Sequence, residues 1–253
     1  MGLCKTPREI ALMRAAGRLN ACAMRTMAEA IKPGVTTRQL DTIAKRVIES
    51  GGGVPLFYGY HGYSANICAS VNSCVVHGIP NDTPLQEGDI VSIDVGTSLQ
   101  GWGADMAKTF AVGRISKAAQ DLISGTEAGF AAGLAQMRPG NRVGDIGAAV
   151  QKSAEDMGYG VVRVLTGHGI GRKMHEEPSL PNFGTAGRGM TLKAGMTLAL
   201  EPMITQGTWR VETRADGWAV HTADGKLAAH YEHTVLITPN GPELLTVEDE
   251  AIN

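Results

Sequence analysis

The amino-acid sequence predicts an α+β protein made of two similar halves, each with two helices followed by a few strands. Residues with helical periodicity are followed by short apolar runs typical of strands, and the same order returns in the second half of the sequence. Lys-Pro-Gly at residues 32–34 returns as Arg-Pro-Gly at residues 138–140, so that the two prolines are 139 − 33 = 106 residues apart. At an offset of 107, residues 87–94 match residues 194–201, since both read as a turn, an apolar strand and an acid. We interpret these ordered matches as an internal repeat, with chance similarity between two generic units as the alternative.

Both helices of the first half have start and stop signals. Thr6 and Glu9 form a capping box around Pro7, a residue that suits the first helical turn, and this helix is expected to extend to Ile31. A second helix begins at Thr36 and ends at a run of three glycines. Strands are expected around residues 67–71, 90–95 and 109–112, with a Gly-rich turn at 101–103.

The second half repeats this order, with helices expected at residues 117–137 and 143–157. The two halves, at about 6–112 and 117–246, are expected to share one sheet, with helices on its outer face and a cleft between them. Because no low-complexity stretch separates them, we predict a single domain over residues 1–253.

Composition narrows the classes of partner. Lys and Arg number 23 against 25 Asp and Glu, a net charge of −2, and no basic run is dense enough for a nucleic-acid patch, so we expect no nucleic-acid partner. No apolar stretch approaches the ~20 residues of a membrane span, and the first residues lack the apolar region of a secretory signal. The four cysteines form no C-x-x-C pair, which indicates free thiols in a reducing cytoplasm.

Four acids lie in or beside apolar strand segments, where an unpaired carboxylate is costly. A hairpin would bring Asp94 and Asp105 opposite each other, and a cation would relieve their repulsion. Taken singly, Asp94 is better explained as a strand cap and Asp105 as a solvent-facing residue. Glu201 and Glu232 add two more embedded acids, and glycines on both sides of His168 allow its imidazole to reach into a site. Such a set can hold two divalent metal ions, and a metal pair roughly 3.5–4 Å apart can activate a water, which points to metal-assisted hydrolysis.

Two more histidines and an aromatic cluster are candidates for substrate contacts. His175 follows a glycine-rich segment and is a candidate electrophile. His77 is a further candidate, although a lone histidine after two valines is more often structural. Aromatic and sulfur-containing side chains offer a polarisable surface that suits a thioether, although an ordinary packed loop explains the aromatic run equally well. These candidate pocket residues are Tyr60, Tyr63, Cys68, Met174 and Trp218.

Taken together, these motifs resemble bacterial type I methionine aminopeptidases, in the same order and over about Thr6 to Thr246. The resemblance is carried by Ile31–Thr37, Tyr60–Tyr63, Val76–Pro80, Glu87–Ile90, Ser92–Val95, Gly167–Gly171, His175–Pro178, Leu200–Met203 and Tyr231–Thr234. Two departures concern pocket detail: Met106 stands where the family commonly has Thr, and Met174 where it commonly has Phe.

The resemblance implies the pita-bread fold, a curved and largely antiparallel sheet covered by helices. It implies two divalent ions, with Co, Mn, Fe, Zn and Ni all open, bound by Asp94, Asp105, His168, Glu201 and Glu232. It implies catalytic roles for His77, His175 and Glu201, and a substrate pocket formed by Tyr60, Tyr63, Cys68, His77, Met174, His175 and Trp218.

The expected reaction is removal of the N-terminal methionine from nascent polypeptides by a water that the two metal ions activate. Glu201 takes the proton, His175 stabilises the oxyanion and His77 contacts the scissile amide. We expect a cytoplasmic monomer that favours small second residues; whether it acts at the ribosome stays open. The rivals are a proline-specific pita-bread peptidase, which usually carries an extra N-terminal domain, and a pita-bread binding protein that performs no chemistry.

Overall fold

The structure is a computed structural model that describes residues 2–247. The helices are α1 (Pro7–Ala30), α2 (Thr37–Ser50), α3 (Lys117–Gln136) and α4 (Val143–Asp156), with a single 3-10 turn, η1, at Tyr60–Gly62. The strands of the first half are β1 (Val54–Pro55), β2 (Ile67–Val71), β3 (Cys74–Val76), β4 (Ile90–Leu99) and β5 (Trp102–Ala111). Those of the second half are β6 (Gly160–Val161), β7 (Gly167–Gly169), β8 (Glu176–Leu180), β9 (Thr197–Leu200), β10 (Met203–Thr205), β11 (Val211–Thr213), β12 (Val220–Thr222), β13 (Ala228–His230), β14 (Glu232–Thr238) and β15 (Gly241–Leu244).

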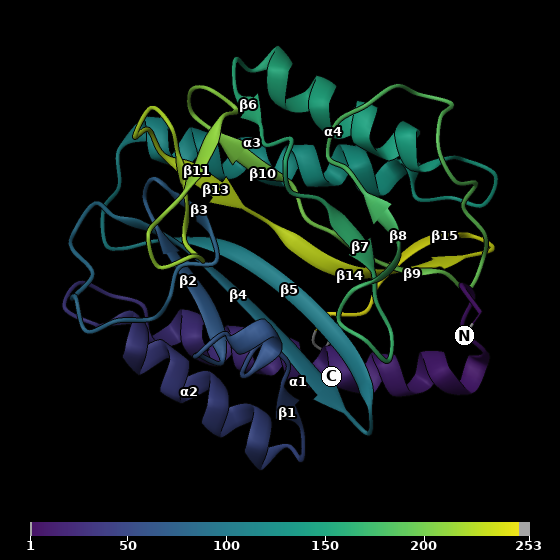
Figure 1. Ribbon diagram of the computed structural model, residues 1–253, viewed down its shortest axis with the longest axis horizontal. Helices are drawn as coiled ribbons and strands as arrows, with labels where there is room; N and C mark the ends of the chain where they lie inside the picture. Colours follow the sequence, from purple (N-terminus) through teal and green to yellow (C-terminus); the bar gives the residue numbers. More distant parts are fainter. Residues whose placement is uncertain (1, 248–253) are drawn as a thin grey trace, which may run out of the picture.

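The main sheet runs through both halves. Its strand order is β1-β4-β5-β14-β9-β7-β8, with β2 beside β4 and β15 beside β14, and all of these pairs are antiparallel. The long strands β4, β5 and β14 curve across the molecule between the two helix pairs (Figure 1). Two three-stranded sheets, β13-β10-β6 and β11-β12-β3, complete the strands. The predicted α+β class and the curved, helix-covered antiparallel sheet are confirmed.

The helices begin where their capping residues predicted. Thr6 Oγ1 accepts from the backbone of Glu9, and the Glu9 carboxylate accepts from the backbone of Thr6 at 2.8 Å, which completes the capping box. Thr36 and Gln39 form the same motif at the start of α2. Because these signals are local in sequence, the boundaries of the helices were predicted to within a residue or two.

The internal repeat is visible in the helices and in their contacts. Adding 106 to the bounds of α2 gives the bounds of α4, 143 and 156. Thr36, just before α2, forms an isolated bridge with Pro84, and Arg142, just before α4, forms one with Thr191. Thr36 and Arg142 are 106 residues apart, and Pro84 and Thr191 are 107 apart, so the two bridges are equivalent in the repeat. The prediction of a single domain stays a prediction, and its ends at residues 1 and 253 lie outside the described residues.

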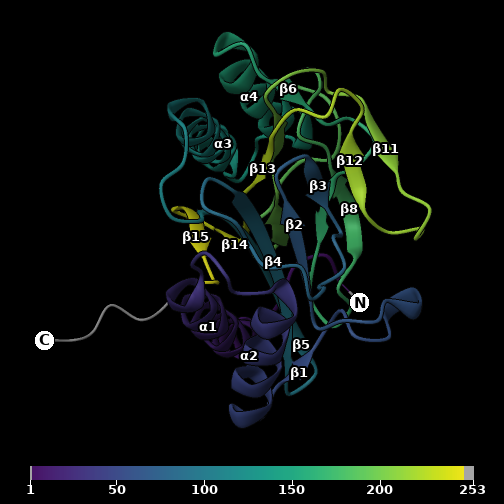
Figure 2. The same ribbon diagram turned by 90° about the vertical axis from the view of Figure 1, so that its left-hand side faces the viewer.

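Each helix pair covers its own half of the sheet. Met27, Leu40 and Ile48 pack on Val91 and Ile93 of β4. Both helix pairs lie on one side of the sheet, as the turned view shows, while β11 and β12 lie on the other (Figure 2). In the second half, side chains of α3 and α4 pack on side chains of β9 and β14 in the corresponding core. This core contains Phe130, Ile146, Val150, Leu198, Leu200, Val235 and Ile237.

The hairpin of β4 and β5 departs from the prediction. Both strands are ten residues long, and the turn lies at Gln100-Gly101 rather than at residues 101–103. Both turn residues have positive φ, 53° and 76°, as a tight two-residue hairpin requires. Trp102 therefore belongs to β5, where it is buried. Among the described helices, none is long and apolar enough to cross a bilayer.

Candidate metal centre and cavity

Strand alternation brings the acidic residues to the face of the sheet that the helices leave open. On β4 the odd-numbered residues Val91 and Ile93 face the helices, so Asp94 faces the other way. The same alternation turns Leu200 toward the second helix pair and Glu201, the next residue, toward the open face. A polar residue within an apolar strand here marks the face opposite the core.

Register places two of the acids in one row across three strands. Ala107 on β5 is the partner of both Asp94 on β4 and Glu232 on β14, so its small side chain lies between two carboxylates. Asp105 pairs with Gly96, so it lies diagonally from Asp94 and not directly opposite, as the sequence had suggested. The turn at Gln100-Gly101 sets this register.

His168 comes from the central strand of the second half. Its partner on β9 is Ala199, and its two neighbouring glycines have no room for a side chain. A Cβ on Gly167 would lie 2.3 Å from the Ala199 carbonyl oxygen, and one on Gly169 would lie 2.1 Å from that of Glu177. The predicted reason for these glycines, close backbone approach, is confirmed.

The imidazole of His168 is held in one tautomer. Its Nδ1 lies 3.0 Å from the carbonyl oxygen of Gly169, which only accepts, so Nδ1 carries the proton and Nε2 presents a lone pair. Nε2 lies 3.5 Å from Oε1 of Glu201. Burial, followed by the nearby His175, lowers the pKa of His168 to about 4, so the ring is neutral at physiological pH. The lone pair of Nε2 and the carboxylate oxygen repel each other, and a cation bound by both would remove this repulsion.

The carboxylates are buried together, and within residues 2–247 no Lys or Arg forms an ion pair with them. Burial and then the charges of the neighbouring acids raise the pKa values of Asp94, Glu201 and Glu232 well above their usual range. Burial raises the pKa of Asp105 to about 7. One oxygen each of Asp94, Asp105 and Glu232 is buried and has no hydrogen-bond partner among the described residues. Four acids in one buried space are therefore short of positive charge.

Divalent metal ions fit this set of donors. Asp105, His168 and Glu232 offer ligand atoms within 4.8 Å of one another, and so do Glu201, His230 and Glu232. Glu232 belongs to both groups and can bridge two ions. Carboxylate oxygens with a neutral imidazole suit first-row divalent metals. The structure thus brings together all five predicted ligands, which come from β4, β5, β7, β14 and the end of β9.

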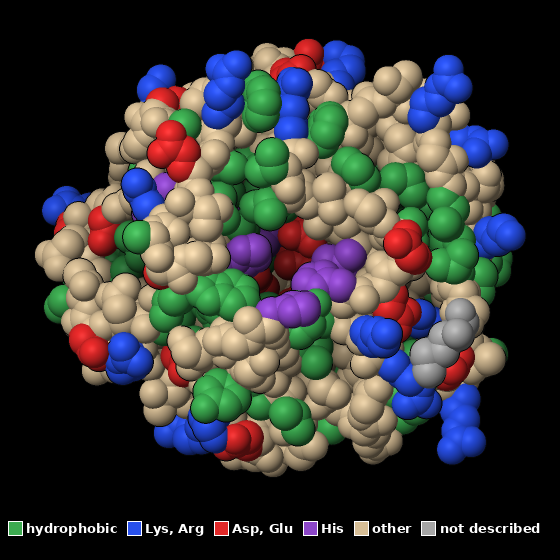
Figure 3. All heavy atoms as spheres, in the orientation of Figure 1, with side chains coloured by type: hydrophobic (Ala, Val, Ile, Leu, Met, Phe, Trp, Pro, Cys, Tyr) green, Lys and Arg blue, Asp and Glu red, His purple; other side chains and the backbone are tan. Residues whose placement is uncertain are grey.

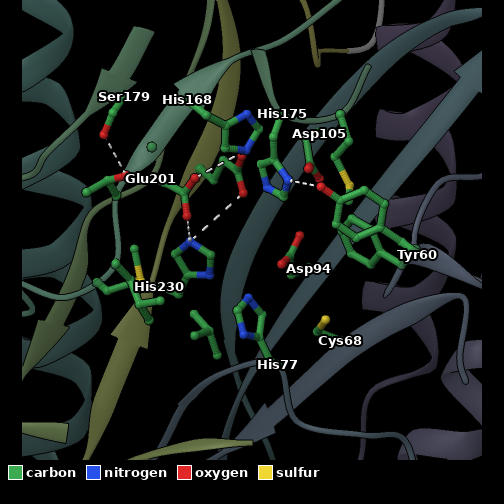
Figure 4. A pocket seen from close by; sticks show the side chains of 18 of the residues that line it. Tyr60, Cys68, His77, Asp94, Asp105, His168, His175, Ser179, Glu201 and His230 are labelled. Atoms are coloured by element: carbon green, nitrogen blue, oxygen red, sulfur yellow. Dashed lines mark hydrogen bonds and ion pairs between the residues drawn. The ribbon is translucent and has the colours of Figure 1, made fainter. Parts of the chain in front are cut away.

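Two more histidines border the carboxylates. His175 stacks edge-on against His168 with ring centroids 4.2 Å apart, and its Nδ1 lies 2.6 Å from the hydroxyl of Tyr60. Burial lowers the pKa of His175, and burial with the influence of His175 lowers that of His77. Figure 4 shows His77 and His175 on opposite sides of Asp94. Both predicted non-ligand imidazoles therefore reach the cavity.

The predicted pocket residues also come together. A cavity of about 490 Å³ is lined by the five carboxylate and imidazole candidates and by an apolar wall beside them. Within that wall, Tyr63 meets Trp218 edge-on with ring centroids 4.9 Å apart, and Cys68 and Met174 are buried next to them. The space-filling view shows histidines around a central hollow and acidic side chains at its bottom (Figure 3). The wall is made of Phe57, Tyr60, Tyr63, Cys68, Met174 and Trp218.

Two residues near the cavity went unnoticed in the sequence. His230 lies two positions before Glu232, and strand alternation offered a signal that it shares the face of Glu232. Lys5 gave no signal, because its partner Glu176 is 171 residues away in sequence. Its ammonium lies 2.7 Å from the Glu176 carboxylate, directly beside His175.

Comparison with known proteins agrees with this geometry. The model of metallopeptidase family M24 matches residues 11–239 of the chain. A protein of Clostridium perfringens named methionine aminopeptidase is 50% identical over 247 residues, which cover 98% of this chain and 99% of that protein. Methionine aminopeptidase 1 of Bacillus subtilis is 46% identical over 246 residues, covering 97% and 99%.

A solved structure has nearly the same fold. The crystal structure of methionine aminopeptidase from Rickettsia prowazekii superimposes with a TM-score of 0.95 at 42% sequence identity, covering 96% of this chain and 99% of that chain. The match spans both halves of the sheet and therefore every element that carries a candidate site residue.

Proposed function

Since the chain belongs to metallopeptidase family M24, we propose that it is a metal-dependent aminopeptidase that removes methionine from the N-terminus of peptides and nascent proteins. The observation that carries this proposal is the position of the carboxylate and imidazole cluster at the bottom of a cavity with an uncharged, sulfur-containing and aromatic wall. The cluster supplies hydrolytic chemistry, and the wall suits a thioether side chain.

We propose that the centre holds two divalent ions. Divalent ions bound there act as Lewis acids that activate a water and polarise the substrate carbonyl. Imidazole and carboxylate ligands accept Co, Mn, Fe, Zn or Ni, and availability decides among them. The proposed ligands are Asp94, Asp105, His168, Glu201 and Glu232.

The remaining steps fall to side chains of this protein. Glu201 takes the proton of the attacking water, because its carboxylate lies in the cavity among the other proposed metal ligands. His175 donates to the oxygen of the scissile carbonyl: the Tyr60 hydroxyl at Nδ1 favours the tautomer that carries its proton on Nε2. His77, on the other side of Asp94, contacts the scissile amide or the leaving amine.

The proposed specificity follows from the apolar wall. Tyr60, Tyr63, Cys68, Met174 and Trp218 are uncharged, so a lysine side chain in that space would lack a partner. We propose that small second residues are favoured. The proposed substrates are nascent polypeptides in the cytoplasm, with a monomer as the acting species and action at the ribosome as a further option.

The test is the release of methionine from Met-Ala-Ser by protein loaded with Mn²⁺ or Co²⁺. We expect hydrolysis that a chelator abolishes and that added metal restores. Protein treated identically but carrying Asp94→Asn serves as the inactive control. Preference for an X-Pro peptide would instead identify a proline-specific peptidase, and metal binding without hydrolysis of any peptide would indicate a binding protein.

A further inference from the structure

His230 is an imidazole at the metal cluster to which the sequence pattern assigned no role. It is 2% exposed. Its Nε2 lies 3.8 Å from Oε2 of Glu201 and 3.9 Å from Oε2 of Glu232, and it has no hydrogen-bond partner among residues 2–247. A buried polar atom without a partner, facing two carboxylates, calls for a functional explanation.

The backbone of His230 is fixed firmly. Its N–H donates to Oγ1 of Thr109 at 2.9 Å, and that hydroxyl in turn donates to the His230 carbonyl oxygen at 2.9 Å. Thr109 also lies 2.8 Å from the hydroxyl of Ser92, so β13 is tied to both β4 and β5 at this residue. The ring therefore extends from a rigid point, and its direction toward Glu201 is a property of the fold.

The two histidines that face Glu201 differ in where they can carry a proton. His168 carries its proton on Nδ1, because that atom faces the Gly169 carbonyl oxygen. No described residue holds the Nδ1 of His230 in this way, and Figure 4 shows this second nitrogen on the side of His77. A neutral imidazole has one N–H, and two carboxylate oxygens attract it to Nε2. Nε2 of His230 is therefore suited to donate a hydrogen bond, whereas Nε2 of His168 presents a lone pair.

Glu201 presents one oxygen to each histidine. Oε1 lies on the side of His168, and Oε2 on the side of His230 (Figure 4). A metal ion held by His168 on the side of Oε1 would leave Oε2 available for a hydrogen bond. A side-chain adjustment of roughly 1 Å brings Nε2 and Oε2 within hydrogen-bond distance.

We propose that His230 is a positioning residue, whose Nε2–H donates to Oε2 of Glu201 and holds that carboxylate in the orientation it needs beside the metal. This inference rests on the proposed function, in which Glu201 binds metal and accepts a proton. Groups that orient a ligand in this way typically change metal affinity or activity by roughly 10–100-fold when they are removed.

Three substitutions of similar size separate a donor from simple packing. In His230→Gln the amide nitrogen reaches the level of Nε2, in His230→Asn it reaches only the level of Nδ1, and His230→Leu has no donor. We measure the Kd of Mn²⁺ for the metal-free proteins by titration calorimetry, and kcat and KM for Met-Ala-Ser. The Asn and Leu variants are expected to bind Mn²⁺ roughly 10–100-fold more weakly and to lose kcat more than KM, while Gln stays close to the wild type.

His233→Gln is the matched control. This histidine is also buried, but it lies on the helix side of β14, where its ring nitrogens face Thr246 and Tyr231. Its substitution should leave the Kd of Mn²⁺ unchanged, which separates loss of orientation from loss of packing.

Other results overturn the inference. If Gln is as weak as Leu, or if Leu binds and turns over as the wild type does, His230 does not act by donating to Glu201. X-ray absorption of the Co²⁺-loaded wild type and His230→Gln counts imidazole ligands, and loss of one in the variant would make His230 a metal ligand instead. Failure of the wild type to cleave any peptide would overturn the proposed function, while the Mn²⁺ affinities would still test the position of His230.

Discussion

Lys5 and Glu176, 171 residues apart in sequence, form a buried ion pair beside the catalytic cavity. The ammonium and carboxylate are 2.7 Å apart, with side chains 5% and 17% exposed. Glu176 also accepts a hydrogen bond from the backbone N–H of Lys173. The two contacts of the Glu176 carboxylate therefore fix the short segment that carries His175. Burial tends to raise the pKa of Glu176, but the hydrogen bonds from Lys5 and Lys173 outweigh it and the pKa is lowered.

We therefore predict that Lys5→Met both destabilises the protein and lowers its activity. Removal of one partner from a buried pair leaves an uncompensated charge, and we expect a loss of roughly 1–3 kcal/mol, below the value for fully buried pairs because water reaches Glu176. Urea unfolding and kcat for Met-Ala-Ser measure the two effects. Lys117→Met, which breaks the exposed pair with Asp121, is the control and should leave stability nearly unchanged, because exposed ion pairs contribute little. Equal losses in the two variants would contradict a special role for the Lys5 pair.

Asp94→Asn and Glu201→Gln are predicted to abolish turnover while the fold is retained. Each substitution removes negative charge from the proposed metal centre, and the second also removes the proton acceptor. Metal analysis, circular dichroism and hydrolysis of Met-Ala-Ser are the measurements. Near wild-type activity in either variant would show that the chemistry lies elsewhere.

His175→Ala is predicted to lower kcat by roughly 10²–10³-fold with metal content unchanged, as for the loss of one oxyanion donor. Tyr60→Phe should lower kcat by a smaller factor, because it leaves the imidazole in place and removes only the hydroxyl at Nδ1. Loss of metal from His175→Ala would instead identify His175 as a ligand.

The peptide preference is predicted to be Met over Leu or Lys at the first position, and Gly, Ala or Ser over Leu or Arg at the second. An apolar wall discriminates by only ~1–3 kcal/mol per methylene, so norleucine peptides should still be cleaved. Values of kcat/KM for the Met-, Leu-, norleucine- and Lys-Ala-Ser peptides test this order. Faster cleavage of the Leu or Lys peptide would indicate a general aminopeptidase.

Metal removal is predicted to make stability depend on pH. Burial raises the pKa of Asp105 from 3.8 to about 7 in the metal-free folded protein. A carboxyl with a raised folded pKa contributes stability that is present below its unfolded pKa and is lost as the pH rises through the folded pKa. Relative to Asp105→Asn, in which the buried histidines titrate as they do in the wild type, the Tm of the chelated wild type should therefore fall between about pH 4 and pH 7.

Bound metal should counter this loss, since ions that bind only the folded state at a hundredfold excess over Kd add about 2.7 kcal/mol. The difference in Tm with and without Mn²⁺ is thus expected to widen toward neutral pH. In Asp105→Asn, where the carboxyl is gone, the contribution of Asp105 to the pH dependence of the chelated protein should be absent. A constant difference in Tm across this range would contradict the shared burial of the acids.

The sequence predicted those features that depend on neighbours along the chain. Helix α2 was found because its cap and its glycine stop are local, and helix α4 because the same order of elements returns in the second half. The acid at the end of an apolar strand was recognised in each half for the same reason. The pita-bread fold and the family that the motifs implied are likewise confirmed. What the sequence did not predict depends on register: Gln100-Gly101, an uncommon pair for a tight turn, shifts Asp105 to a diagonal position. Distant pairs such as Lys5 and Glu176 leave no mark in a single sequence.

The arrangement of the ligands across both halves also concerns how the enzyme is made. Asp94 and Asp105 belong to the first half, whereas Glu232 lies in β14, close to the carboxyl end of the chain. During synthesis the site therefore stays incomplete until β14 has left the ribosome and inserted between β5 and β9. Until then a growing chain cannot bring all the proposed metal ligands together.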